Sequence, residues 1–269
     1  MTSATDRLNL PAYSKFGNAQ IELMESITVT PAVQLVEQSG ILSRAEAGEE
    51  LTVLDSAGGS GILTYVLKSK LKAGAKVKVV LEDVEQTMVD LAKERTAKEG
   101  WKDVEPRVVD ALNLDFPDSS LDYIMINCGL QLFPEQDKPL KEVARTLKPR
   151  GVLSYSSWTV VPFFTLLSQV DSSISHPPPF SLPCSIPSSI PSYLAQYGFS
   201  ANDVKIEDVK AKRTWKSAAD AVKDFALGAP KLFEDEERNG KLVELLKKQQ
   251  GEGEVELVWE GVAVTARKA

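Results

Sequence analysis

The feature that most constrains this chain is an alternation of short apolar runs with amphipathic segments over residues 51–158. Three segments carry apolar residues at helical spacing, namely 61–72, 86–100 and 135–147. Five runs between and around them have the length and the Val, Ile, Leu and Tyr content of buried strands, and they cover 51–55, 77–83, 106–110, 121–127 and 151–158. Strands that alternate with helices form parallel sheets through crossover connections. The sequence therefore predicts an α/β, doubly wound sheet with helices on both faces.

The flanking segments extend this sheet and cover it. Two further strands are predicted at 204–213 and 254–267, with helices near 217–227 and 235–249 between them. Residues 1–45 are predicted to form an N-terminal helical cap, because 18–40 carries apolar residues at helical spacing. Pro31 follows Thr30 and suits the first turn of a helix. With no repeat and no second core, we expect residues 1–269 to form a single domain.

Residues 160–191 break the pattern, because they are dense in Pro, Ser and aromatic residues without a clear period. We expect a long irregular insertion after the fifth strand. Long loops without secondary structure are uncommon and often cover active sites. The insertion is therefore predicted to be a lid over an acceptor pocket. The alternative is a surface loop, with the pocket under the N-terminal cap instead.

The composition of the chain excludes several classes of ligand and partner. The chain has 31 basic and 38 acidic side chains, and this net charge of −7 argues against a nucleic-acid partner, which needs a concentrated basic face. No apolar stretch approaches the roughly 18 residues of a membrane helix, and the first residues lack a signal sequence. With His176 as the single histidine, a His-rich metal site is excluded. We expect a cytoplasmic monomer or homodimer with a small-molecule substrate, no membrane partner and no metal.

The most informative motif is VLDSAGGSG, where a strand ends in Asp55 and passes through small residues into a helix. Ala57, Gly58, Gly59 and Gly61 let backbone N–H groups approach a ligand, and the helix start adds partial positive charge. Asp55 would repel a pyrophosphate and attract the ammonium group of a zwitterion. The structural alternative is tight packing of the helix on the sheet.

The spacing of the glycines argues against a nicotinamide cofactor. If Gly59 and Gly61 begin a dinucleotide fingerprint, Thr64 stands where a third Gly or Ala belongs. The chain also shows no evident Tyr/Lys or His/Asp pair for hydride transfer. A nicotinamide-dependent oxidoreductase is therefore the less favoured alternative.

Two further strands end in an acid. Asp83 lies about 20 residues beyond the glycines, the spacing at which an acid binds ribose hydroxyls in such folds. Glu82 is the alternative, but the helix begins directly after Asp83. Asp110 can accept a hydrogen bond from the exocyclic amine of adenine. Each acid alone could be a helix N-cap, whereas three at the carboxyl edge of one sheet predict a nucleoside-containing ligand.

These residues resemble a class I S-adenosylmethionine (SAM)-dependent methyltransferase. VLDSAGGSG matches the family pattern of strand, acid, small residue, x, Gly, x, Gly, with Ala57 in place of the usual first Gly. EDVEQTMVDLA is similar to the ribose-binding segment and DALNLDFPDSSLDYIMIN to the adenine-binding segment. The helical cap and the insertion make the layout similar to small fungal methyltransferases of secondary metabolism, including thiol methyltransferases.

The resemblance implies a Rossmann-like, seven-stranded mixed sheet and SAM as the cofactor. It also implies a role for each matching residue. Asp55 and the loop of Ala57, Gly58, Gly59 and Gly61 would hold the methionine part, Asp83 the ribose, and Asp110 and Ala111 the adenine. Asn127 would lie near the sulfonium, and Val84 would also contact the cofactor.

Methyl transfer is an in-line displacement, to which alignment and the exclusion of water contribute most. A thiolate or amine acceptor needs no strong base, whereas a phenol benefits from one, and His176 is the catalytic candidate. Trp158, Phe163 and Phe180 are candidates for an apolar acceptor pocket.

The sequence thus predicts methyl transfer to S, O or N of a small, apolar or aromatic metabolite. The main alternative is a methyltransferase-like protein that binds SAM for regulation without transferring the methyl group.

Overall fold

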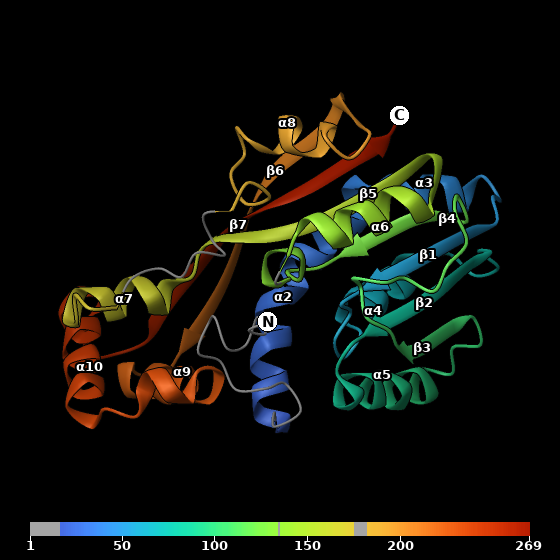
Figure 1. Ribbon diagram of the computed structural model, residues 1–269. Coiled ribbons are helices and arrows are strands. Elements are labelled where there is room, and N and C mark those ends of the chain that lie inside the picture. The colour runs from blue at the N-terminus through green and yellow to red at the C-terminus, as the bar shows by residue number, and fades with distance from the viewer. Residues whose placement is uncertain (1–16, 134, 175–181) are drawn as a thin grey trace.

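The computed structural model describes residues 17–133, 135–174 and 182–269 (Figure 1). Its strands form one seven-stranded mixed sheet in the order β3-β2-β1-β4-β5-β7-β6. β7 runs antiparallel to both of its neighbours, and the other pairs are parallel. The strands are β1 (Leu51–Ser56), β2 (Val77–Asp83), β3 (Val104–Val108), β4 (Leu121–Ile126), β5 (Leu147–Val160), β6 (Phe199–Trp215) and β7 (Val255–Lys268). This confirms the predicted α/β fold class.

Helices connect and cover these strands, and the described residues also include two short 3-10 segments. The helices are α2 (Asn18–Gln38), α3 (Ile41–Glu46), α4 (Ile62–Lys70), α5 (Gln86–Glu99), α6 (Asp137–Thr146), α7 (Pro162–Val170), α8 (Ile190–Ala195), α9 (Ala218–Gly228) and α10 (Glu236–Gln250). The 3-10 segments are η2 (Leu130–Leu132) and η4 (Pro230–Phe233).

Alternate strand residues build two apolar layers, because successive side chains of a strand point to opposite faces. Val53 and Met125 belong to the layer that packs against α2 and α4. Their neighbours Leu54 and Ile124 belong to the layer that packs against α6 and α8. α2 and α6 therefore cover opposite faces of the sheet (Figure 1).

A helical lobe made of α7, α9, η4 and α10 surrounds the far ends of β6 and β7, at the lower left of Figure 1. Aromatic side chains fill it: Trp215 lies 5.5 Å from Phe225 and 6.2 Å from Trp259 between ring centroids. Phe163 lies 5.8 Å from Phe225. Because β5 and β6 both run toward this end, the lobe stands beyond the carboxyl edge of the sheet.

The expectation of an irregular insertion at 160–191 is wrong for its first part, since residues 162–170 form α7. Pro162 is tolerated in the first turn of α7, because the N–H groups of a first turn have no partner within the helix. Phe164 and Leu167 are buried in the core. The sequence pattern did not indicate this short helix, because the Pro and Ser residues that follow it dominate the segment. Residues 182–195 form turns and α8.

The expectation that Pro31 begins a helix is also wrong, because Pro31 lies inside α2. A proline within a helix costs about 3 kcal/mol. α2 nevertheless continues, because residues on both sides of it, including Ile27 and Leu35, are buried in the same layer. Tertiary packing outweighs the local penalty here.

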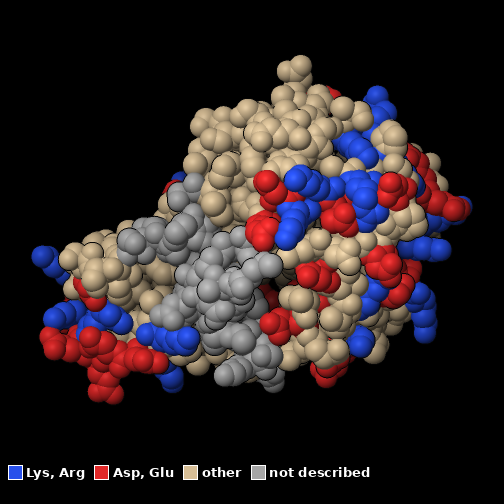
Figure 2. Space-filling model, in the orientation of Figure 1, with Lys and Arg blue, Asp and Glu red and all other residues tan. Residues whose placement is uncertain are grey.

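Charged side chains of both signs are interspersed over the face seen in Figure 2, and Lys and Arg do not gather there into one basic surface. Among the described helices, none is long and apolar enough to cross a bilayer.

Candidate active site

A largely apolar cavity of about 370 Å³ lies where β1, β2, β3 and β4 end. Open α/β sheets bind ligands at this carboxyl edge. Its wall brings together most of the residues predicted to bind the cofactor: Ala57, Gly58, Gly59, Asp83, Val84, Asp110, Ala111 and Asn127. Asp55 and Gly61, which were predicted with them, do not line the cavity.

The glycine loop, residues 57–61, folds closely against β2. A Cβ atom on Gly58 would lie 3.0 Å from Asp55 and from Leu81, and one on Gly61 would lie 2.8 Å from Leu81. Gly61 and Ala57 have φ angles of 86° and 51°, in the left-handed region that favours glycine. The glycines therefore permit packing of the loop as well as a close approach of ligand.

Asp55 lies beneath this loop with 1% of its surface exposed. Its Oδ2 accepts hydrogen bonds from the N–H of Thr64 at 3.1 Å and from the Thr64 hydroxyl at 2.6 Å, which fixes the first turn of α4. Its Oδ1 is buried without a hydrogen-bond partner and would lie 3.0 Å from a Cβ on Gly58. Burial raises the pKa of Asp55 to about 7. Contact of Asp55 with the methionine part of SAM stays a prediction.

Asp83 joins the loop to the end of β2. Its Oδ2 accepts from the N–H of Gly59 at 2.9 Å, and its Oδ1 accepts from the N–H of Glu85 at 3.0 Å. Burial raises its pKa. The neighbouring Glu82 is fully buried and accepts from the Ser56 hydroxyl at 2.8 Å. Of these two acids, it is Asp83 that lines the cavity.

At the β3 end of the cavity, Asp110 and Ala111 stand beside apolar surface. Asp110 is exposed, and its Oδ1 accepts from the N–H of Leu112 at 2.9 Å. Val84 has 63% of its surface exposed and faces the same space. An exposed valine beside a carboxylate suits a flat ring with a polar edge.

Asn127 at the end of β4 is held from two sides. Its Nδ2 donates to the carbonyl of Thr28 at 3.0 Å, and its Oδ1 accepts from the Ser156 hydroxyl at 2.8 Å. The N–H of Cys128 donates to Ser156 Oγ at 2.9 Å. Cys128 has a φ of 56°, and burial raises the pKa of its thiol to about 12, so it is a neutral wall residue.

α2 contributes a wall that sequence reasoning did not assign to the cavity: Ile21, Met24, Glu25 and Thr28. Their spacing of i, i+3, i+4 and i+7 places them on one helix face, which is the signal that could have identified them. Glu25 accepts from the Ser60 hydroxyl and from Arg95 Nη2 at 2.6 Å. The cap thus contacts the glycine loop and α5 directly.

The two described residues that were predicted for the acceptor pocket lie outside the cavity. Trp158 is buried against β7, where a Cβ on Gly261 would lie 2.9 Å from its ring. Phe163 belongs to the aromatic cluster of the helical lobe. Neither lines the cavity. His176 and Phe180 fall outside the described residues. Their roles stay predictions.

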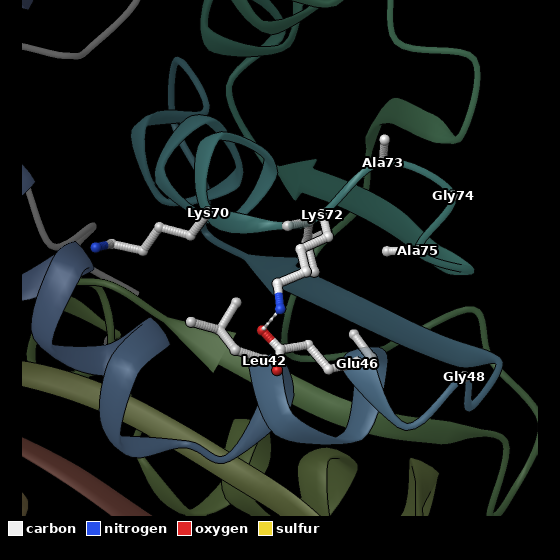
Figure 3. Close-up of a pocket in the computed structure, with 10 residues that line it drawn as sticks. Leu42, Glu46, Gly48, Lys70, Lys72, Ala73, Gly74 and Ala75 are labelled. Atoms are coloured by element: carbon white, nitrogen blue, oxygen red, sulfur yellow. Dashed lines mark ion pairs between the residues drawn. The ribbon is translucent and has the colours of Figure 1, made fainter.

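A second cavity of about 250 Å³ lies between α3 and the turn after α4 (Figure 3). Lys72 points across it to Glu46 at 3.1 Å, and Lys70 points away and pairs with Glu37 at 2.8 Å. Its lining residues 70–75 come directly before β2, so this second cavity lies at the amino edge of the sheet, opposite the first cavity. Both lysines are already paired with carboxylates, so we assign no ligand to it.

Comparison with known proteins agrees with this arrangement. A family model described as "Methyltransferase domain" matches residues 47–180, about half of the chain. "Methyltransferase tpcH" of Aspergillus fumigatus is 29% identical over 141 residues, which are 52% of this chain and 49% of that protein. A "Ubiquinone/menaquinone biosynthesis C-methyltransferase UbiE" of Francisella tularensis is 38% identical over 122 residues, covering 44% and 46%. The matched region thus spans about half the length of these curated relatives.

Solved structures share the fold. The crystal structure of a SAM-dependent methyltransferase from Aquifex aeolicus aligns with a TM-score of 0.55 and 18% identity, covering 94% of this chain and 99% of that one. The matched domain begins just before β1 and includes the glycine loop, Asp83, Asp110 and Asn127. The chain therefore belongs to the class I SAM-dependent methyltransferase family.

Proposed function

We propose that this chain transfers a methyl group from SAM to a small, apolar acceptor. The observation that carries the proposal is the cavity at the carboxyl edge, where the glycine loop, Asp83 and Asp110 share a wall with apolar side chains. Family membership implies the cofactor, and the relatives named as methyltransferases support the reaction.

The residues of the cavity fit SAM chemically. Asp83 would accept from the ribose hydroxyls, Asp110 from the adenine amine, and Val84 would cover the adenine face. Asp55 lies beneath the glycine loop and outside the cavity wall, so its part in binding would be to hold the loop and the first turn of α4 in place through Thr64. When bound, SAM supplies a methyl group already activated for displacement. The protein then has to align the acceptor and exclude water.

Four classes of acceptor atom are considered. The sequence favours S, O or N, and the relatives named C-methyltransferases add carbon as a fourth class. Cys128 is a neutral thiol and the Asn127 amide is engaged on both sides, so neither acts as a base. We infer an acceptor that ionises readily by itself, with His176 as the candidate base if the acceptor is a weakly acidic alcohol or phenol.

Calorimetry with SAM and S-adenosylhomocysteine tests cofactor binding. Loss of a charged hydrogen-bond partner typically costs on the order of 1.5–3 kcal/mol, so Asp83→Ala should weaken binding about tenfold or more. Asp90→Ala is the matched control, because Asp90 is an exposed residue of α5 outside the cavity. Unchanged affinity in a folded Asp83→Ala protein would remove the ribose assignment.

Mass spectrometry separates the alternatives. A gain of one methyl group on a thiol, phenol, amine or enol acceptor identifies the reaction and the atom class. Tight SAM binding with no methylated product across that panel would favour a regulatory SAM-binding protein. Spectral titration with NADH addresses the oxidoreductase alternative, for which we expect no saturable binding.

A further inference from the structure

α2 runs from the carboxyl edge of the sheet to its amino edge. The carbonyl of Thr28 meets Asn127, which follows the last residue of β4. Further along, Gln38 donates to Thr265 of β7, and Arg44 of α3 lies 3.7 Å from Asp122 at the start of β4. A helix rises 1.5 Å per residue, so Ile21 extends roughly 10 Å past Thr28, beyond the ends of the strands. Residues 18–27 therefore form an overhang above the cavity.

This overhang is fixed on both sides. Toward the cofactor side, Glu25 accepts from Ser60 of the glycine loop. Toward the helical lobe, Gln20 Nε2 donates to the carbonyl of Leu227 at 2.8 Å, and the Ser26 hydroxyl accepts from Arg213. A helix end held by a loop, a strand and a second helix forms a firm wall rather than a fraying terminus.

The cavity wall divides into two parts. The residues that fit SAM come from the ends of β1, β2 and β3, and Asn127 marks the boundary. The remaining wall comes from α2 and from the segment after β4, and its uncharged members are Ile21, Met24, Thr28, Cys128, Leu132 and Phe133. Burial raises the pKa of the Cys128 thiol to about 12, so this thiol is neutral. Glu25 is the carboxylate on this side, and it is paired with Arg95 and the Ser60 hydroxyl.

We propose that the acceptor binds between the α2 overhang and residues 128–133, and that Met24 and Ile21 are specificity-determining residues for an uncharged, apolar ring system. This inference rests on the proposed function and names its acceptor subsite. An apolar wall across from the strand end stabilises such a ring by removing apolar surface from water. A methionine side chain adapts to rings of different outline.

Two methionines of the same cavity give a matched test. Met24 lies on the overhang, whereas Met88 lies at the start of α5, two residues into the helix that follows the ribose-binding segment. In the full chain we expect Met24→Ala to raise the KM for 2-naphthalenethiol about tenfold while the Kd for S-adenosylhomocysteine stays within twofold. Met88→Ala should show the reverse pattern. Thermal melting checks that both variants are folded.

A blocking variant sharpens the result. Met24→Trp should fill the subsite and exclude 2-naphthalenethiol, with cofactor affinity again unchanged. If that probe is not turned over, quenching of 2-naphthol fluorescence by the protein loaded with S-adenosylhomocysteine measures binding at the same place.

The possible failures are distinguishable. Loss of cofactor affinity in both Met24 variants would place Met24 in the cofactor subsite and overturn the inference. Unchanged probe binding in both variants would also overturn it, and a dependence on His176 would then place the acceptor at the insertion. If the unmodified protein fails to bind SAM at all, the proposed function fails first.

Discussion

At the scale of single residues, the acids beneath the glycine loop link stability to pH. Asp55 and Glu82 are both buried, and burial raises the pKa of each carboxyl to about 7. In the unfolded chain these groups lose their protons near pH 4. Between about pH 4 and pH 7 the folded protein therefore binds more protons than the unfolded chain. The free energy of unfolding contributed by these groups falls as pH rises through that range.

Glu82→Gln tests this linkage, because glutamine stays neutral at every pH. Relative to the unmodified protein, the variant should become more stable as pH rises from 5 to 8, by up to about 1.4 kcal/mol per pH unit. Urea denaturation at the two pH values measures the difference. Glu49→Gln is the control: hydrogen bonding from Arg44 lowers the pKa of that carboxyl, so its effect should not change over this range. An equally flat result for Glu82→Gln would contradict the linkage.

The sequence predicted the site residues that directly follow apolar runs, such as Asp83 and Asp110, because the end of a buried strand is visible in the pattern. It did not predict Ser156 or Glu25. Ser156 meets Asn127 only because β5 pairs with β4, and Glu25 meets Ser60 only because α2 crosses the sheet edge. Such contacts depend on tertiary packing, which a single sequence does not encode locally.

At the scale of elements, α2 is attached to α5 through Glu25 and Arg95, whose side chains are each 22% exposed. A partly buried pair whose carboxylate also accepts from the Ser60 hydroxyl should couple more strongly than a surface pair. Double-mutant cycles with alanine should give about 1 kcal/mol or more for Glu25 and Arg95, but about 0.5 kcal/mol or less for Glu37 and Lys70, which join α2 to α4 at the surface. Equal coupling in the two cycles would mean that α2 is positioned by apolar packing alone.

Element boundaries followed the pattern wherever the period was strong. The predicted strand at 77–83 is β2, and the predicted helix at 86–100 is α5 with Gly100 at its left-handed end. The pattern failed at Pro31 and at residues 162–170, where proline signals are ambiguous. A proline marks a first turn in α7 and an interior position in α2, and only the burial of the flanking residues separates the two cases.

At the scale of the whole molecule, one buried apolar cluster runs from the α2 and α4 face of the sheet into the helical lobe. The lobe should therefore not unfold separately, which tests the single-domain prediction. In a variant with Trp101→Phe and Trp158→Phe, the fluorescence of the two remaining tryptophans, Trp215 and Trp259, reports on the lobe, and far-UV circular dichroism reports on the whole chain. We expect the two unfolding transitions to coincide in urea. An earlier fluorescence transition would reveal a separate folding unit.

The position of β7 between β5 and β6 governs the order in which the chain can assemble. β6 is synthesised first but hydrogen-bonds in the sheet only through β7, which is made about 40 residues later. As the chain leaves the ribosome, the first five strands can pair while β6 and its apolar side chains still lack a partner. Closure by pairings between distant parts of the sequence is slow. The contacts that Arg213 of β6 and the Leu227 carbonyl of α9 make with the overhang should therefore form after the cofactor side of the cavity.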